Sequence, residues 1–329
     1  MSVSPLAWLA LAIIVTGLLM VDFIGHARRP HPPSIREAIG WTSGYTCLAV
    51  VYGLAVWGSE GRTYAGQFYA GWLTEWSLSV DNLFVFILIL SAFRVPRDFQ
   101  QKALLLGIAT ALVLRLAFIL AGAALIRHFS WVFYLFGAFL VYTAVKQLLD
   151  ARKDDDTEED ATAYVDNSVT RFVRRLLPTT DGFVGNKLIH RHAGRTMITP
   201  LLIVVIALGT ADLMFAFDSI PAIFGLTSEP FLVFSATAFS LLGLRQLFFL
   251  IDGLLSHLVY LPYGLTVILG FIGLKLVNHA LHQNTLPFIN GGRPVTAFPE
   301  PSTEVSLGLI VITLALVAVT SLIHARRRA

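Results

Sequence analysis

Four acidic side chains interrupt two stretches that are otherwise apolar enough to cross a membrane. Glu75 and Asp81 lie in AGWLTEWSLSVDNLFVFILILSA (residues 70–92), and Asp212 and Asp218 repeat their six-residue spacing in TADLMFAFDSIPAIFGL. An ionisable group at membrane depth costs about 2.5–3.5 kcal/mol to insert, so such groups face a protein interior or a wet cavity and generally have a function. The two motifs therefore predict an ion-binding site built from two copies of one element.

Neighbouring side chains supply further candidate ligands for this site. Asn82 and Ser219 each directly follow the second acid of a motif, and Met214 lies one helical turn before Asp218. Carboxylate, amide and hydroxyl oxygens favour hard cations such as Mn²⁺, Mg²⁺ or Ca²⁺, whereas the thioether of Met214 would favour Mn²⁺ among them. A methionine in an apolar helix is also a common packing residue. The candidate metal ligands are Asp81, Asp218, Glu75, Asp212, Asn82, Ser219 and Met214.

Four basic residues lie in the apolar segments that follow the acidic ones, and their order recurs. Arg115 and then Lys146 follow the first acidic pair, and Arg245 and then Lys275 follow the second. Four acids and four bases can neutralise one another, which makes buried charge tolerable. The order acid, arginine, lysine predicts two three-helix units that enter the membrane from opposite sides, an inverted repeat. Alternatively, these charges are structural ion pairs that hold the helices in register.

The composition predicts that these segments belong to an all-α, polytopic membrane protein in a lipid bilayer. Of the 329 residues 56% are hydrophobic and 14% are charged, against about 25% charged in soluble domains. Nine segments meet the length of roughly 20 residues that a spanning helix needs, at 5–24, 40–57, 70–92, 103–126, 130–149, 198–226, 230–254, 259–280 and 305–324. They divide the chain into two N-terminal helices (1–67), a first repeat (68–149), a cytoplasmic charged loop (150–197), a second repeat (198–280) and an outer loop with the last helix (281–329).

The distribution of lysine and arginine predicts the orientation in the membrane. With the N-terminus outside, the successive cytoplasmic segments hold three, three, eight and three basic residues, which is 17 of the 24 in the chain. The outer side holds Arg62, Arg127 and Arg293. Because cytoplasmic loops are enriched in these residues, we expect an N-out, C-in topology.

Other functional classes find little support in the sequence. The single cysteine, Cys47, excludes an intramolecular disulfide and a cysteine-based metal site. The formal charge of +3 is spread over several loops, which gives no indication of nucleic-acid binding. Neither a P-loop nor an HExxH or GxSxG motif occurs, so we expect neither an enzyme nor a prosthetic cofactor. The acidic run DDDTEED at 154–160 is typical of a solvated loop and identifies no protein partner.

Six motifs resemble those of the TerC family of integral membrane proteins. They are EWSLSVDN (75–82), GIATALVLRLAFILAG (107–122), FGAFLVYTAVK (136–146), DLMFAFDSIPAIFGLT (212–227), LLGLRQLFFL (241–250) and GFIGLK (270–275). The resemblance covers about residues 68–280 and implies a metal-related membrane function. Family members are associated with tellurite resistance by name and with Mn²⁺ export across the bacterial inner membrane, whereas chloroplast relatives are linked to thylakoid membrane-protein assembly. The resemblance places its motif acids at Glu75, Asp81, Asp212 and Asp218.

Together these observations lead us to expect an exporter of divalent cations, with Mn²⁺ as the expected ion, in the bacterial plasma membrane. Moving two positive charges outward costs about 4.6 kcal/mol against an inside-negative potential of about 100 mV. Since no nucleotide-binding motif is present, we expect proton antiport, with carboxylates exchanging metal for protons. Arg115, Arg245, Lys146 and Lys275 would compensate the empty site. The alternative is a membrane-protein assembly factor or a metal- or tellurite-stress factor without transport of its own.

Overall fold

The structure is a computed structural model that describes residues 3–24, 35–129, 131–150, 178–180, 182–192, 195–251, 260–284 and 286–328. The acidic run at 154–160 and most of the predicted cytoplasmic loop lie outside these ranges. Within the described helices, the backbone alone is described for Val80, Asp81, Phe84, Asp150, Arg245, Ile251 and residues 325–328.

Nine long helices form the body of the described part of the protein, in agreement with the nine predicted segments. They are α1 (Pro5–Asp22), α2 (Ile35–Glu60), α3 (Arg62–Ala92), α4 (Arg97–His128), α5 (Val132–Asp150), α8 (Pro200–Phe224), α9 (Pro230–Ile251), α10 (Leu261–His282) and α11 (Thr303–Arg328). Eight of them are long and apolar enough to cross a membrane. The exception is α3, whose 31 residues include the polar groups Glu75, Asp81 and Asn82. The protein is thus a multi-pass membrane protein whose body is all-α.

Three helices begin earlier than hydropathy predicted. Helix α2 begins at Ile35 instead of residue 40, α3 at Arg62 instead of 70, and α4 at Arg97 instead of 103. Backbone hydrogen bonds continue through the polar turns that flank each apolar stretch, whereas hydropathy detects only the apolar part. The true boundaries follow backbone signals: Gly61 separates α2 from α3 with a φ of 95°, and Pro96 immediately precedes α4.

A short β-hairpin precedes α8, where the sequence predicted only a loop. Strand β1 (Ile189–His192) pairs antiparallel with β2 (Arg195–Ile198). The amine of Lys102 on α4 donates a hydrogen bond to the carbonyl of Asn186 at 2.5 Å, which ties the segment just before the hairpin to the bundle. Strands of four residues with charged members are too short and too polar to give a recognisable alternating pattern.

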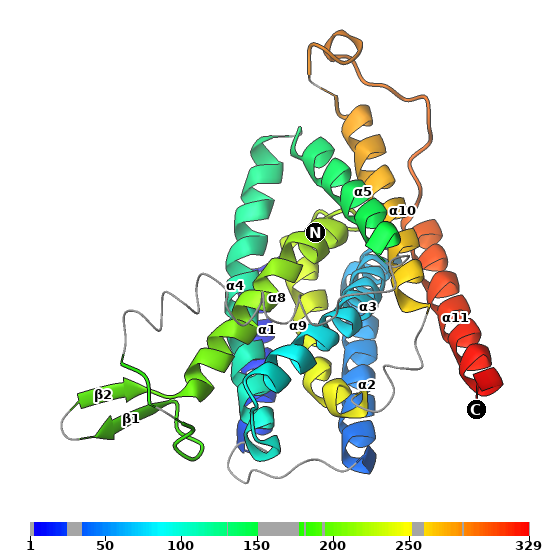
Figure 1. Cartoon of the computed structure of the whole chain (residues 1–329). Helices are drawn as coiled ribbons and strands as arrows, with labels where there is room; N and C mark the ends of the chain where they lie inside the picture. The colour runs from blue at the N-terminus through cyan, green and yellow to red at the C-terminus, as the bar shows by residue number, and fades with distance from the viewer. Residues whose placement is uncertain are drawn as a thin grey trace.

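The two groups of three helices on either side of the charged loop pack against one another instead of forming separate bodies. Helix α5 packs on α10, α3 on α9, and α4 on α8. In Figure 1, α4 lies on one side of the bundle and α10 and α11 on the other, with α3, α8 and α9 between them. This arrangement buries Glu75 and Asn82 of α3 and Asp212 and Ser219 of α8 in the interior.

Two glycines allow a close crossing of α5 and α10. A Cβ atom on Gly137 would lie 2.8 Å from the carbonyl oxygen of Gly273, and one on Gly273 would lie 3.0 Å from the carbonyl oxygen of Gly137. A Cβ atom at either position would be too close to a backbone oxygen of the facing helix, so a larger residue would require the two backbones to move apart. The crossing fixes α5, and with it Thr143 and Gln147, beside α8.

Candidate functional site

The guanidinium of Arg115 joins the acidic motifs of α3 and α8. Its Nε donates to Oδ2 of Asp212 at 2.7 Å and its Nη2 to Oδ1 at 3.1 Å, a bidentate pair that matches the planar guanidinium to the carboxylate. Its Nη1 donates to the carboxylate of Glu75 and, at 3.1 Å, to the hydroxyl of Ser219. All four side chains are buried. We call Glu75, Arg115, Asp212 and Ser219 the arginine cluster.

Helix periodicity explains how α8 contributes two members of this cluster. Asp212 and Ser219 are seven residues apart and therefore lie on the same helix face, two turns from each other. Glu75 reaches the same guanidinium from α3, and Arg115 comes from the middle of α4. Helices α3, α4 and α8 thus meet at one guanidinium.

The arginine cluster contains one formal positive charge and two carboxylates. Oε2 of Glu75 is buried and has no hydrogen-bond partner within the described part of the chain. A buried carboxylate that is only partly compensated carries a large desolvation cost. The cluster can lower that cost by taking up a proton or a further cation.

A second polar centre, distinct from the cluster, surrounds Asp218. A cavity of about 110 Å³ is lined by Asn82 of α3, Thr143 and Gln147 of α5, and Asp218 of α8, with apolar walls from Leu78, Phe215 and Leu269. The hydroxyl of Thr143 donates to Oδ1 of Asp218 at 3.3 Å. No described residue holds Asp218 in a salt bridge. Since one water takes up roughly 30 Å³ in the liquid, the cavity has room for a few waters or a partly hydrated cation.

The amide of Asn82 also lacks a complete set of partners. Its Nδ2 atom is buried, and no described residue accepts a hydrogen bond from it. Asn82 lies seven residues after Glu75, about 10 Å further along α3. The cavity and the arginine cluster therefore both take residues from α3 and α8, where Ser219 of the cluster directly follows Asp218 of the cavity.

The structure separates the predicted basic residues from one another. Lys146 is exposed on α5 and near enough to Asp218 for a favourable Coulombic interaction. Lys275 is half-buried elsewhere, where its amine donates to the hydroxyl of Ser306 on α11 at 3.0 Å. Of these two lysines, only Lys146 thus acts on an acid of the predicted site.

Met214 does not join the cavity to which the sequence assigned it. Its side chain is 54% exposed on the outer face of α8. Phe215, three residues before Asp218, lines the cavity instead. A spacing of four residues allows two side chains to share a helix face, but the orientation of α8 in the bundle decides which of them points inward.

Two further predicted residues have described backbones only. Asp81 lies in α3 beside Asn82, and Arg245 lies in α9, but both side chains lie outside the described part of the structure. Their roles therefore remain predictions. Among the described residues, no three His, Cys, Asp or Glu side chains gather closely enough to hold a metal ion.

Sequence reasoning missed Thr143 and Gln147. They are four residues apart and face the same cavity. The available signal was this pair of uncharged polar residues, one on each side of Lys146, in an otherwise apolar segment. Charge gives the stronger signal in an apolar segment, so the sequence pointed to Lys146, whereas Thr143 and Gln147 line the cavity beside Asp218.

The fold and the buried polar centre define a multi-pass membrane protein with two carboxylates at one arginine and a third beside a cavity. The family model described as "Integral membrane protein TerC family" matches residues 60–329. The chain therefore belongs to the TerC family. The resemblance inferred from the six motifs is confirmed and extends through the last helix.

Similar proteins come from several bacteria. The uncharacterized membrane protein Rv2723 of Mycobacterium tuberculosis is 49% identical over 329 residues, covering 100% of this chain and 82% of the relative. The uncharacterized membrane protein STKORF319 of Myxococcus xanthus is 38% identical, covering 98% and 94%. A protein of Escherichia coli K12 named "Putative membrane-bound redox modulator Alx" is 37% identical, covering 83% and 86%. No solved structure matches the chain.

Substitution of Arg115 tests whether this residue neutralises the cluster. We expect Arg115→Met to lower the free energy of unfolding by about 3–5 kcal/mol, because it leaves two buried carboxylates unpaired. Adding Glu75→Gln and Asp212→Asn to Arg115→Met should recover most of that loss. Unfolding of the purified protein in detergent micelles measures both effects.

The matched control is Arg97→Met, at an exposed arginine of the same helix. It should change stability by no more than about 0.5 kcal/mol. Equal losses for Arg115→Met and Arg97→Met, or no recovery in the triple variant, would contradict the assigned role of Arg115.

Proposed function

We propose that this protein exports divalent cations, with Mn²⁺ as the favoured ion, and that the ion binds in the cavity beside Asp218. The observation that carries the proposal is the contrast between Asp212 and Asp218. Asp212 is held by two hydrogen bonds from Arg115, whereas Asp218 borders a cavity and accepts one hydrogen bond from Thr143. A carboxylate that must bind and release a cation cannot already be locked to a guanidinium.

The proposed ligands are all oxygen donors from three helices. Asp218 supplies the charge, Asn82 and Gln147 supply amide oxygens, and Thr143 supplies a hydroxyl. Asp81, adjacent to Asn82 in the sequence, is the further carboxylate that the motif predicts. This set suits a hard cation such as Mn²⁺. No ligand role is proposed for Met214, because its side chain faces outward.

The arginine cluster serves as a counter-charge near the ion, and its net charge becomes negative when Glu75 releases a proton. Glu75, Asp212 and Ser219 contact Arg115, so they support the site without binding the metal. The partly compensated carboxylate of Glu75 is the proposed proton carrier. When the cation occupies the cavity, its field favours release of a proton from the cluster, since two positive charges in one low-dielectric region repel each other.

Proton antiport provides the driving force. Outward movement of one divalent cation costs about 4.6 kcal/mol at about 100 mV, and inward movement of two protons cancels that charge. Glu75 and Asp218 are two carboxylates that can each take one proton. Exchange of one cation for two protons would therefore be electroneutral.

The packing of the helices supports the inverted repeat. Exchanging α3 with α8, α4 with α9 and α5 with α10 converts the α3–α9 contact into the α8–α4 contact and returns α5–α10 to itself. The reciprocal contacts of Gly137 and Gly273 follow the same exchange. If Gly137 corresponds to Gly273, then Lys146 corresponds to His282 and not to Lys275. The proposed repeat therefore relates the two acidic motifs to each other but does not relate Lys146 to Lys275.

The N-out, C-in topology makes a direct prediction about two loops at opposite ends of the bundle (Figure 1). In a Cys47→Ala background, a cysteine replacing the exposed Phe288 should react with a membrane-impermeant maleimide in intact cells. A cysteine replacing Ile189 of β1, which is also exposed, should react only after the cells are permeabilised. The reverse pattern, or labelling of both from outside, would rule out this orientation.

Transport itself is tested with purified protein in liposomes, where Mn²⁺ flux and internal pH are followed together. Wild-type protein should move Mn²⁺ and carry protons in the opposite direction. Asp81→Asn and Asp218→Asn should reduce the flux to that of empty liposomes, because each removes charge at nearly constant shape. Thr143→Val should raise KM more than it lowers kcat, because it removes a ligand and leaves the carboxylate.

The matched control for these variants is Asp98→Asn, at an exposed acid in the first turn of α4. Its flux should equal that of wild type, and gel filtration should show that every variant is folded. Absence of flux in wild type would refute the exporter, and flux that persists in folded Asp218→Asn would refute the site. Flux that is independent of the proton gradient would refute the antiport.

A further inference from the structure

A groove on the outside of the bundle lies between α10 and α11. Its volume is about 530 Å³, and it shares no lining residue with the cavity beside Asp218. Gly264 forms part of its floor, where a Cβ atom would collide with Val317 of α11. The glycine therefore lets the two helices pack closely beneath the groove, while larger side chains form its walls.

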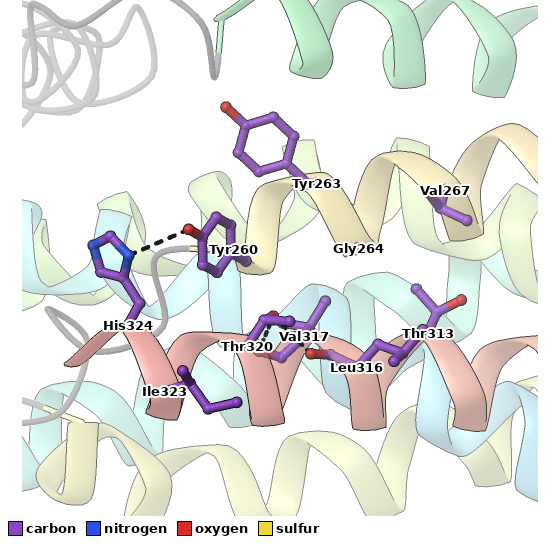
Figure 2. Close-up of a pocket in the computed structure, with 10 residues that line it drawn as sticks. All are labelled: Tyr260, Tyr263, Gly264, Val267, Thr313, Leu316, Val317, Thr320, Ile323 and His324. Carbon is purple, nitrogen blue, oxygen red and sulfur yellow. Dashed lines mark hydrogen bonds between the residues drawn. The ribbon is translucent and has the colours of Figure 1, made fainter. Parts of the chain in front are cut away.

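The groove is polar and aromatic at one end and aliphatic at the other. Figure 2 shows Tyr260 and His324 together at one end and Val267 and Thr313 at the opposite end. The hydroxyl of Tyr260 lies 3.3 Å from Nδ1 of His324. Leu316 and Val267, which line the aliphatic part, are more than half exposed. Such a gradient matches a lipid, with a polar head near tyrosines at the interface and an acyl chain along the aliphatic wall.

The sequence carries three basic residues on α11 just beyond the polar end of the groove. Helix α11 continues past His324 to Arg328 and ends in three consecutive arginines, Arg326–Arg328. These residues follow His324 by two to four positions, about one helical turn. Basic residues at the ends of membrane helices attract the headgroups of anionic lipids.

We propose that this groove binds an anionic glycerophospholipid. The acyl chain lies against Val267 and Leu316, and the phosphate headgroup lies near Tyr260, His324 and the last turn of α11. A second copy of the chain is a poorer fit, because a symmetric contact across this face would bring two runs of three arginines together. The proposal does not depend on the transported ion.

Lipid retention by the full-length purified protein tests this assignment. The protein is equilibrated with equal amounts of phosphatidylglycerol and phosphatidylcholine and analysed by native mass spectrometry. Wild type should retain phosphatidylglycerol preferentially. Thr320→Trp, which fills the groove from α11, should lose this lipid, whereas Val319→Trp, at an adjacent exposed position that does not line the groove, should keep it.

A second variant separates the headgroup from the acyl chain. Replacing Arg326, Arg327 and Arg328 with glutamine should lower the preference for phosphatidylglycerol over phosphatidylcholine by about tenfold or more, because each basic residue contributes to anionic-lipid attraction. Equal retention of the two lipids by wild type would overturn the proposal. An equal loss of bound phosphatidylglycerol in Thr320→Trp and Val319→Trp would also overturn it. The same holds if wild type forms a dimer without bound lipid and Thr320→Trp dissociates that dimer.

Discussion

Two buried carboxylates share one guanidinium in the interior of this protein, and the packing of its central helices must keep the three groups together. Arg115 on α4 reaches Asp212 on α8 and Glu75 on α3, and all three side chains are excluded from solvent. A buried charge is tolerable only when it is paired and hydrogen-bonded. Any arrangement that separated these helices would leave unpaired charges in a low-dielectric environment. The arginine cluster therefore constrains the packing of the bundle.

This constraint divides otherwise similar residues into different roles. Asp212 and Asp218 lie six residues apart on α8, but only Asp212 is bound by the arginine. Asp218 faces a small cavity with Asn82 and Thr143, in which a cation can replace weak hydrogen bonds with direct coordination. The proposed transport mechanism requires both environments, since the arginine cluster attracts the cation once Glu75 has lost its proton and the accessible carboxylate of Asp218 binds it.

The close crossing of α5 and α10 connects the cavity to the rest of the fold. Gly137 and Gly273 allow the two backbones to approach, and α5 then presents Thr143 and Gln147 beside Asp218. Because this crossing joins a helix of each proposed repeat, a relative movement of the two repeats would change the wall of the cavity. In inverted-repeat transporters, such movements expose a central site to each side of the membrane in turn.

The sequence predicted the features that depend on local chemistry and missed those that depend on packing. Charged residues in apolar segments marked Glu75, Asp212, Asp218 and Arg115, because charge at membrane depth is rare and costly. The inward orientation of Phe215 in place of Met214 depends on how α8 is rotated in the bundle, which spacing alone does not specify. Thr143 and Gln147 carry no charge and so gave a weak signal. The hairpin at 189–198 was missed because its strands are too short for a periodic pattern.

The most direct test of the account is to locate Mn²⁺ in the protein by anomalous X-ray scattering at the manganese edge. The account predicts one peak in the cavity bordered by Asn82, Thr143 and Asp218, with the hydrogen bonds between Arg115 and Asp212 intact. A peak between Glu75 and Asp212, with Arg115 displaced, would contradict it. That result would make the arginine cluster the binding site and would remove the proposed division between the counter-charge in the arginine cluster and the accessible carboxylate of Asp218.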